Sequence, residues 1–177
     1  MSSASNIHKK RNRNKQFADE FGLERLVFFS DAVFAIAITL LALEIRLPED
    51  AGHLSNQQLF KSLVVIWPKY LSFFISFLVI GNFWIAHHHR YRYIQRYDTR
   101  LLLLNLFVLI SIAFIPFSTA VISENGNRTA TIFYSLSIST TGLLSALLWL
   151  YASWKNRLLK DTINGELARR TLLSILS

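Results

Sequence analysis

Four apolar stretches, each close to the length that an α-helix needs to cross a bilayer, constrain the fold of this chain most strongly. They are residues 26–43, 70–86, 101–121 and 130–151. The first covers roughly 27 Å at about 1.5 Å per residue, which is close to the thickness of the hydrocarbon layer. Because 52% of all residues are also hydrophobic, we expect an all-α, polytopic transmembrane helix bundle.

Three further segments complete the expected organisation. Residues 1–24 form a basic arm, and residues 25–177 form the transmembrane domain. Residues 58–66 are either a helical turn that precedes the second span or a piece that lies at the membrane interface. Residues 166–177 begin another helical pattern, but they are too few to cross a bilayer. Either this partial helix lies on the surface or, as we expect, the chain is cut short of further spans at its C-terminus.

The distribution of basic residues predicts the orientation of the spans. The N-terminal arm, the connection at residues 87–100 and the segment that begins at residue 155 are all rich in Lys and Arg, whereas the two opposite connections hold few. Such residues collect in cytoplasmic loops. We therefore expect an integral, multi-pass membrane protein with a cytoplasmic N-terminus, and the net charge of +8 does not indicate a nucleic-acid partner.

The chain offers little to support catalysis, metal binding or a cofactor. It has no cysteine, and no nucleophile elbow, phosphate loop or zinc-protease motif is present. His87, His88 and His89 are adjacent, but neighbouring residues on a helix point about 100° apart and cannot all bind one ion. We therefore expect neither an enzyme nor a metal site.

One carboxylate, Asp31, lies inside the first apolar stretch. An ionised carboxylate in hydrocarbon is costly unless it faces protein or water, so Asp31 should point into the bundle. Arg25 is not its partner within the helix, because six residues turn through about 600° and leave the two side chains about 120° apart. Residues at the same depth on the second and third spans are better candidates. They are Trp84, His87, His88 and Asn105.

Two interpretations of these polar residues remain open from the sequence. They could form a proton relay or ion pathway, or they could form a hydrogen-bonded clamp that fixes helix packing. A closed polar network can hold helices together without touching a substrate, so we favour the clamp.

Another face of the first span carries an apolar stripe. Ile36, Leu40 and Leu43 follow i, i+4, i+7 spacing, and Thr39 lies beside them. In one isolated helix such a stripe faces lipid or packs against another helix. If several copies met around a symmetry axis, the stripe would form apolar rings that gate by dewetting. Periodicity alone does not choose between these cases.

Several motifs are similar to those of the endosomal and lysosomal potassium channel family. Residues 25–31, RLVFFSD, fit its RxxxFSD signature, and the likeness continues through residue 45. WIAHH at residues 84–88, LN at 104–105 and PFST at 116–119 extend it into the second and third spans. The chain resembles the prokaryotic, single-repeat branch, which implies a bacterial cell-membrane protein.

The resemblance implies a tetramer of six-helix subunits whose first helices line a central pore. Ile36, Leu40 and Leu43 would form the constriction, and Thr39 would influence cation choice. The signature residues Arg25, Phe29, Ser30 and Asp31 would pack against the second and third helices, near Trp84, His87 or His88, and Asn105. The sequence departs from this pattern at its C-terminus, because only four complete spans and a partial fifth are visible.

We therefore predict a homotetrameric, potassium-permeable cation channel that conducts passively, with other copies of the chain, membrane lipid and monovalent cations as its partners and no cofactor. The alternative is a proton-coupled secondary transporter that uses Asp31 and His87 or His88 as a relay. A noncatalytic membrane scaffold is a third possibility.

Overall fold

The computed structural model describes residues 2–47, 54–154 and 158, with side chains described from residue 20 onward. This part of the chain contains helices and no strand. The helices are α1 (Ser2–Leu43), α2 (Asn56–Val65), α3 (Trp67–Tyr91), α4 (Thr99–Asn125) and α5 (Arg128–Ser153). The all-α class is therefore confirmed.

Four segments are long and apolar enough to cross a membrane. They are Glu20–Leu43, Trp67–Tyr91, Thr99–Asn125 and Arg128–Ser153. These segments correspond to the four predicted spans, with ends a few residues beyond those expected. The short piece expected before the second span is the separate helix α2, and residues 166–177 lie outside the described residues.

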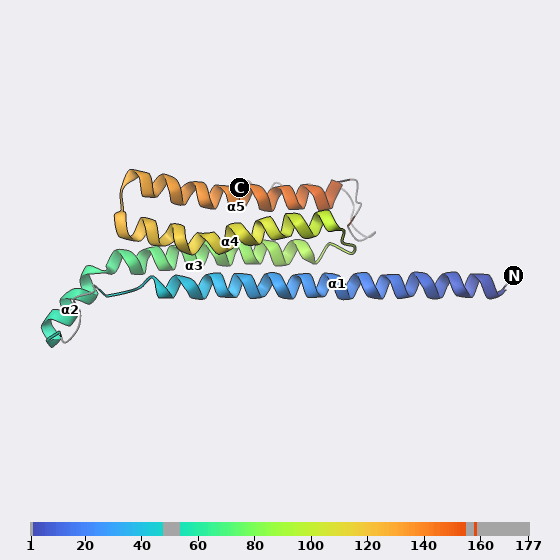
Figure 1. Ribbon diagram of the computed structural model, residues 1–177, viewed down its shortest axis with the longest axis horizontal. Helices are drawn as coiled ribbons and strands as arrows, with labels where there is room; N and C mark the ends of the chain where they lie inside the picture. Colours follow the sequence, from blue (N-terminus) through green and yellow to red (C-terminus); the bar gives the residue numbers. More distant parts are fainter. Residues whose placement is uncertain (1, 48–53, 155–157, 159–177) are drawn as a thin grey trace.

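Local capping explains where several helices begin and end. The side chains of Asp98 and Asn127 accept hydrogen bonds from backbone N–H groups in the first turns of α4 and α5, at 2.8 and 2.9 Å. Ser55 and Gln58 form a capping box at the start of α2. Gly126 ends α4 in the left-handed region, with φ of 56°, a conformation that glycine adopts without steric cost. The chain therefore turns back at once, and α4 and α5 form an antiparallel hairpin (Figure 1).

The bundle is built around α4. Helix α1 packs against α3 and α4, and α5 covers the remaining side of α4, whereas α2 lies beyond one end of the bundle (Figure 1). Apolar side chains from all four long helices meet in one core. Its members include Phe34, Ala37, Leu41, Ile80, Val108, Ile112, Ile115, Leu148 and Trp149.

The first helix begins far earlier than the apolar stretch at residue 26 suggests. Helix α1 is continuous from Ser2, and its N-terminal part projects past the other helices (Figure 1). Residues 2–24 contain no proline and only one glycine, so nothing in this polar sequence interrupts the helix. The basic arm is therefore a helical extension of the first span.

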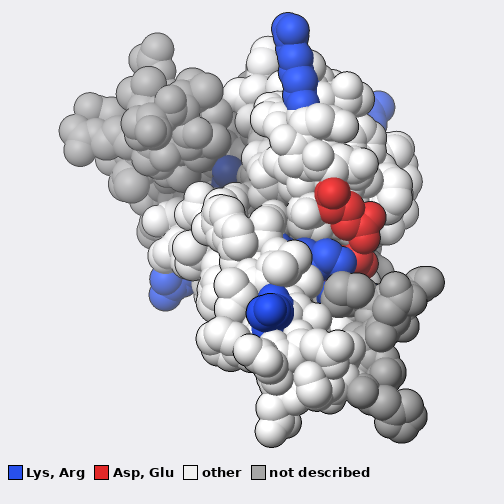
Figure 2. All heavy atoms as spheres, turned by 90° about the vertical axis from the view of Figure 1, so that its left-hand side faces the viewer, with Lys and Arg blue, Asp and Glu red and all other residues white. Residues whose placement is uncertain are grey.

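The opposite end of the bundle, where α2 lies, carries few charges. Figure 2 looks onto this end and shows a mostly uncharged surface with scattered basic side chains and a small acidic group at one side. Lys69 and Glu124 form an ion pair here, with Nζ and Oε1 3.9 Å apart. Such a pair at a partly exposed surface site contributes little to stability.

Candidate pore face and its polar support

A buried chain of hydrogen bonds joins α3, α4 and α1. The Tyr91 hydroxyl donates to Oδ1 of Asn105 at 3.0 Å, and Nδ2 of Asn105 donates to the Ser30 hydroxyl at 3.0 Å. Ser30 in turn donates to the backbone oxygen of Leu26 at 2.9 Å. All three polar side chains are buried. Because each donor meets an acceptor, this series of hydrogen bonds can hold three helices together in a low-dielectric environment.

A second bond ties Asp31 to α3. Nε1 of Trp84 donates to Oδ1 of Asp31 at 2.8 Å, and the carboxylate side chain is half-buried. A bond from the indole N–H to an ionised acceptor is stronger than a neutral one. Asp31 therefore points toward its own subunit, as the sequence predicts.

The two histidines of interest occupy different surroundings. His87 is buried between the rings of Phe34 and Tyr91, whose centroids lie 5.4 and 4.5 Å from its own. Its Nε2 atom has no hydrogen-bond partner among the described residues. His88 is exposed and packs against the ring of Trp84, with centroids 5.6 Å apart. Both flank the polar network, and the described residues contain no cluster suited to a metal ion.

Arg25 and Phe29 do not join this network, contrary to the expectation that all four signature residues pack against the second and third helices. Phe29 is 53% exposed, and Arg25 is exposed with no hydrogen bond or ion pair to any described residue. Helical phase explains the difference. Phe29 and Arg25 lie about 100° and 140° around α1 from Ser30, so they point away from the helices that hold Ser30.

The apolar stripe also faces away from the rest of the subunit. Ile36, Leu40 and Leu43 are 58%, 40% and 58% exposed. Thr39 beside them is exposed, and its hydroxyl donates to the backbone oxygen of Ile36 at 2.8 Å. The opposite face of α1, which contains Phe34, Ala37 and Leu41, is buried against the bundle. Helix α1 thus has one face packed inside the subunit and one face that no described residue covers.

Two further contacts were not predicted from the sequence. Buried Arg90 donates from Nη1 to the hydroxyl of Ser145, and to its backbone oxygen at 3.1 Å, which ties α3 to α5. Tyr91 completes the polar network, and its position four residues after His87 on one helix face was the available signal.

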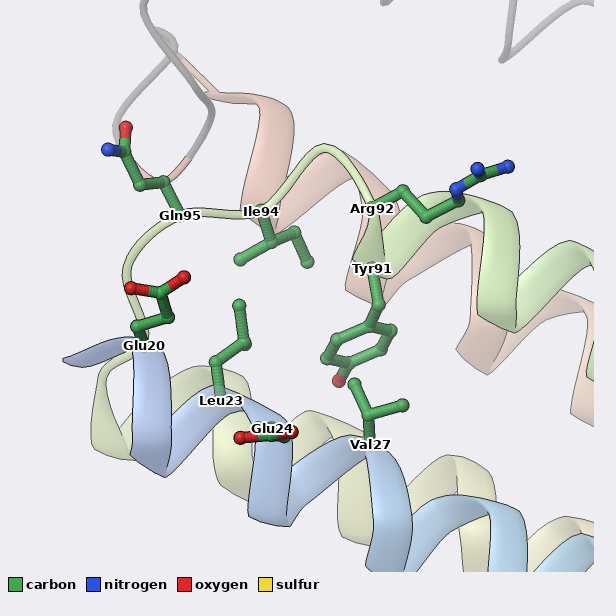
Figure 3. A pocket seen from close by; sticks show the side chains of 8 residues that line it. All are labelled: Glu20, Leu23, Glu24, Val27, Tyr91, Arg92, Ile94 and Gln95. Atoms are coloured by element: carbon green, nitrogen blue, oxygen red, sulfur yellow. The ribbon is translucent and has the colours of Figure 1, made fainter. Parts of the chain in front are cut away.

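A pocket of about 420 Å³ lies between α1 and the α3–α4 connection. Leu23 and Val27 of α1 point across it toward Ile94 and Tyr91, whereas Arg92 points outward (Figure 3). Its remaining lining residues are Glu20, Glu24 and Gln95.

Comparison with known proteins places this arrangement in a family. Residues 25–116 match the family model described as endosomal/lysosomal potassium channel TMEM175. The chain belongs to the TMEM175 family. It is 37% identical over 152 residues to a potassium channel of Streptomyces collinus, which covers 83% of this chain and 72% of that protein.

Two other TMEM175 relatives extend the comparison. The crystal structure of a lysosomal potassium-selective channel TMEM175 homolog from Chamaesiphon minutus superposes with a TM-score of 0.70 at 30% identity, covering 88% of this chain and 83% of that one. The endosomal/lysosomal proton channel TMEM175 of Gallus gallus is 30% identical over 143 residues, which span 78% of this chain but 28% of that protein.

Membership of the TMEM175 family confirms the resemblance seen in the RxxxFSD, WIAHH and LN motifs. Bacterial TMEM175 relatives are named potassium channels, and a channel is not a class of enzyme. Together with the four apolar helices, these relatives identify an integral membrane protein of the channel type. The transporter alternative, with Asp31 and His87 or His88 as a relay, is not favoured.

Proposed function

We propose that this protein is a potassium-permeable cation channel formed by four copies of the chain, with α1 lining the pore. The observation that carries the proposal is the exposed apolar stripe in the C-terminal third of a membrane-spanning helix whose other face is fixed by buried hydrogen bonds. One subunit alone encloses no pore along this stripe, so conduction requires other copies. Four copies around an axis would turn Ile36, Leu40 and Leu43 into three apolar rings.

Such rings close a pore without filling it. Water leaves a sufficiently narrow apolar constriction, and an ion that cannot keep its hydration shell does not enter. The pore opens when the α1 helices splay enough for a hydrated or partly hydrated potassium ion to pass. Thr39 offers the polar layer among these rings and is the candidate for cation selectivity.

We also propose how the chain lies in the membrane. Residues 1–24 form a cytoplasmic basic arm, and residues 25–177 belong to the channel domain in a bacterial cell membrane. The concentration of Lys and Arg at the N-terminal end of the bundle supports this orientation. Four copies of the chain, surrounded by lipid, would make the functional unit, and potassium and other monovalent cations would be its permeant ions.

Potassium flux into liposomes that contain the purified protein tests the proposal. Leu40→Asn should raise the flux, because a polar ring holds water in the constriction. Leu143→Asn is the matched control, since Leu143 is 63% exposed on α5 and has no place in the proposed pore. Flux of sodium and caesium measured in parallel reports selectivity.

Two results would contradict the channel assignment. The first is the absence of cation flux in the unmodified protein. The second is unchanged flux after substitution of each of Ile36, Leu40 and Leu43. Saturable proton flux that depends on a second substrate and disappears in Asp31→Asn would support the transporter instead.

A further inference from the structure

Helical phase places Arg25 on the same line of α1 as Leu43. The two residues are 18 positions apart, and at about 100° per residue 18 positions make about five full turns. Phe29, Ala32 and Ile36 lie within about 40° of this line. Arg25 therefore stands at the N-terminal end of the face that carries the apolar stripe, about 27 Å along the helix from Leu43.

The exposure of these side chains follows the same line. Arg25, Phe29 and Ala32 are exposed, as the apolar stripe is, whereas Ser30 is fully buried. The unpartnered face of α1 thus continues without interruption from Leu43 to Arg25. If four copies bring the apolar stripe to a common axis with α1 nearly parallel to it, the side chain of Arg25 faces the same axis.

Within the part of the chain that the structure describes, no carboxylate neutralises the charge of Arg25. Its side chain has no ion pair with a described residue, and Asp31 is bound to Trp84 on another face. The side chain of Glu24 points about 100° around the helix axis from that of Arg25. Glu24 lines the pocket between α1 and the α3–α4 connection (Figure 3). A guanidinium stays protonated throughout the physiological pH range, so this charge is permanent.

We infer that four copies of Arg25 form a cationic ring at one mouth of the pore, and that this ring makes cations enter more slowly from that mouth than from the other. The inference rests on the proposed tetrameric pore. Near the other mouth, Glu44 and Arg46 are two residues apart and carry opposite charges. The field along the pore is therefore asymmetric, which lowers the local cation concentration at the Arg25 end.

Single-channel currents at equal positive and negative voltages test the inference. The side that bears the N-terminus is identified by an antibody to an N-terminal tag. At an ionic strength of about 0.1 M we expect cation current that enters from the Arg25 end to be the smaller by about threefold. Arg25→Gln should bring the ratio of the two currents closer to one, whereas Arg25→Lys should leave it unchanged.

Arg100→Gln is the matched control, because it removes the same charge at the same end of the bundle from an exposed side chain of α4. It should leave the current ratio unchanged. A second measurement needs no substitution. Raising the ionic strength to about 1 M shortens the Debye length from about 10 Å to about 3 Å, so the ratio in the unmodified channel should approach one.

Specific outcomes separate this inference from the proposed function. A conducting channel whose current ratio responds neither to Arg25→Gln nor to salt overturns the cationic ring and leaves the channel intact. If Arg25→Gln fails to assemble and the unmodified ratio is insensitive to salt, Arg25 pairs with a carboxylate of a neighbouring copy and the ring is likewise overturned. Absence of any cation current overturns both proposals.

Discussion

The amide of Asn105 in α4 donates to the hydroxyl of Ser30 in α1 at 3.0 Å, and both side chains are fully buried. This bond fixes the polar face of α1 against the bundle. The apolar stripe on another face of α1 therefore stays exposed on the surface of the subunit. The same Asn105 accepts from Tyr91 of α3, so one amide connects three helices.

The coupling between Ser30 and Asn105 can be measured directly. Ser30→Ala and Asn105→Ala should each lower the free energy of unfolding in detergent, Asn105→Ala more, because it also leaves the Tyr91 hydroxyl without its acceptor. A double-mutant cycle should give a coupling energy of about 1 kcal/mol, in the range found for hydrogen bonds between membrane helices. Additive effects of the two substitutions would mean that the bond does not stabilise the bundle.

Loss of the bond between Trp84 and Asp31 should lower the free energy of unfolding by a larger amount. Trp84→Phe keeps an aromatic ring but removes the N–H donor, which leaves a half-buried carboxylate without that partner. We expect the free energy of unfolding to fall by about 1.5–3 kcal/mol, the cost typical of bonds to charged groups. Trp154→Phe is the control, since Trp154 is 68% exposed and should change stability little. Equal effects of the two substitutions would exclude a stabilising role for the bond.

Gly22 of α1 lies directly against the side chain of Tyr97. A Cβ atom there would overlap with the phenol ring of Tyr97, so that ring, which belongs to the α3–α4 connection, would have to move. Gly22→Ala should therefore lower the melting temperature, with a cost of about 1–3 kcal/mol. Adding Tyr97→Ala should recover part of that loss.

Gly81→Ala is the control for this contact, because nothing lies within 4 Å of a Cβ built at Gly81. Helix propensity alone should make Gly81→Ala neutral or stabilising. A similar loss of melting temperature at both glycines would show that the Tyr97 contact is not the cause.

Substitution of Thr39 should change cation selectivity rather than stability. Its hydroxyl is exposed within the apolar stripe and uses its proton on the backbone oxygen of Ile36. The oxygen lone pairs therefore remain available to an ion. Thr39→Val should alter the permeability ratio of potassium to sodium, measured from reversal potentials, whereas Thr39→Ser should preserve it. An unaltered ratio in Thr39→Val would exclude this hydroxyl from cation choice.

Hydropathy and depth matching predicted much of this molecule. The four spans follow from apolar length, and the proximity of Asp31 to Trp84 follows from placing the polar residues of three antiparallel helices at one depth. The separation of Asp31 from Arg25 follows from helical phase. These features depend on local geometry, which a single sequence contains.

Other features depend on contacts that periodicity does not encode. Arg25 and Phe29 share a motif with Ser30 and were expected to share its surroundings, but they lie on different faces of α1. The role of Tyr91 and the bond from Arg90 to Ser145 depend on which helices become neighbours. The close approach of Tyr97 to Gly22 depends on the path of the α3–α4 connection.

The unbroken helix from Ser2 to Leu43 has a mechanical consequence. Ser30 is held by Asn105, and the helix extends about 42 Å from it toward Ser2 and about 20 Å toward Leu43. In the proposed channel, a force applied to the basic extension outside the membrane would therefore reach the apolar stripe through one continuous helix.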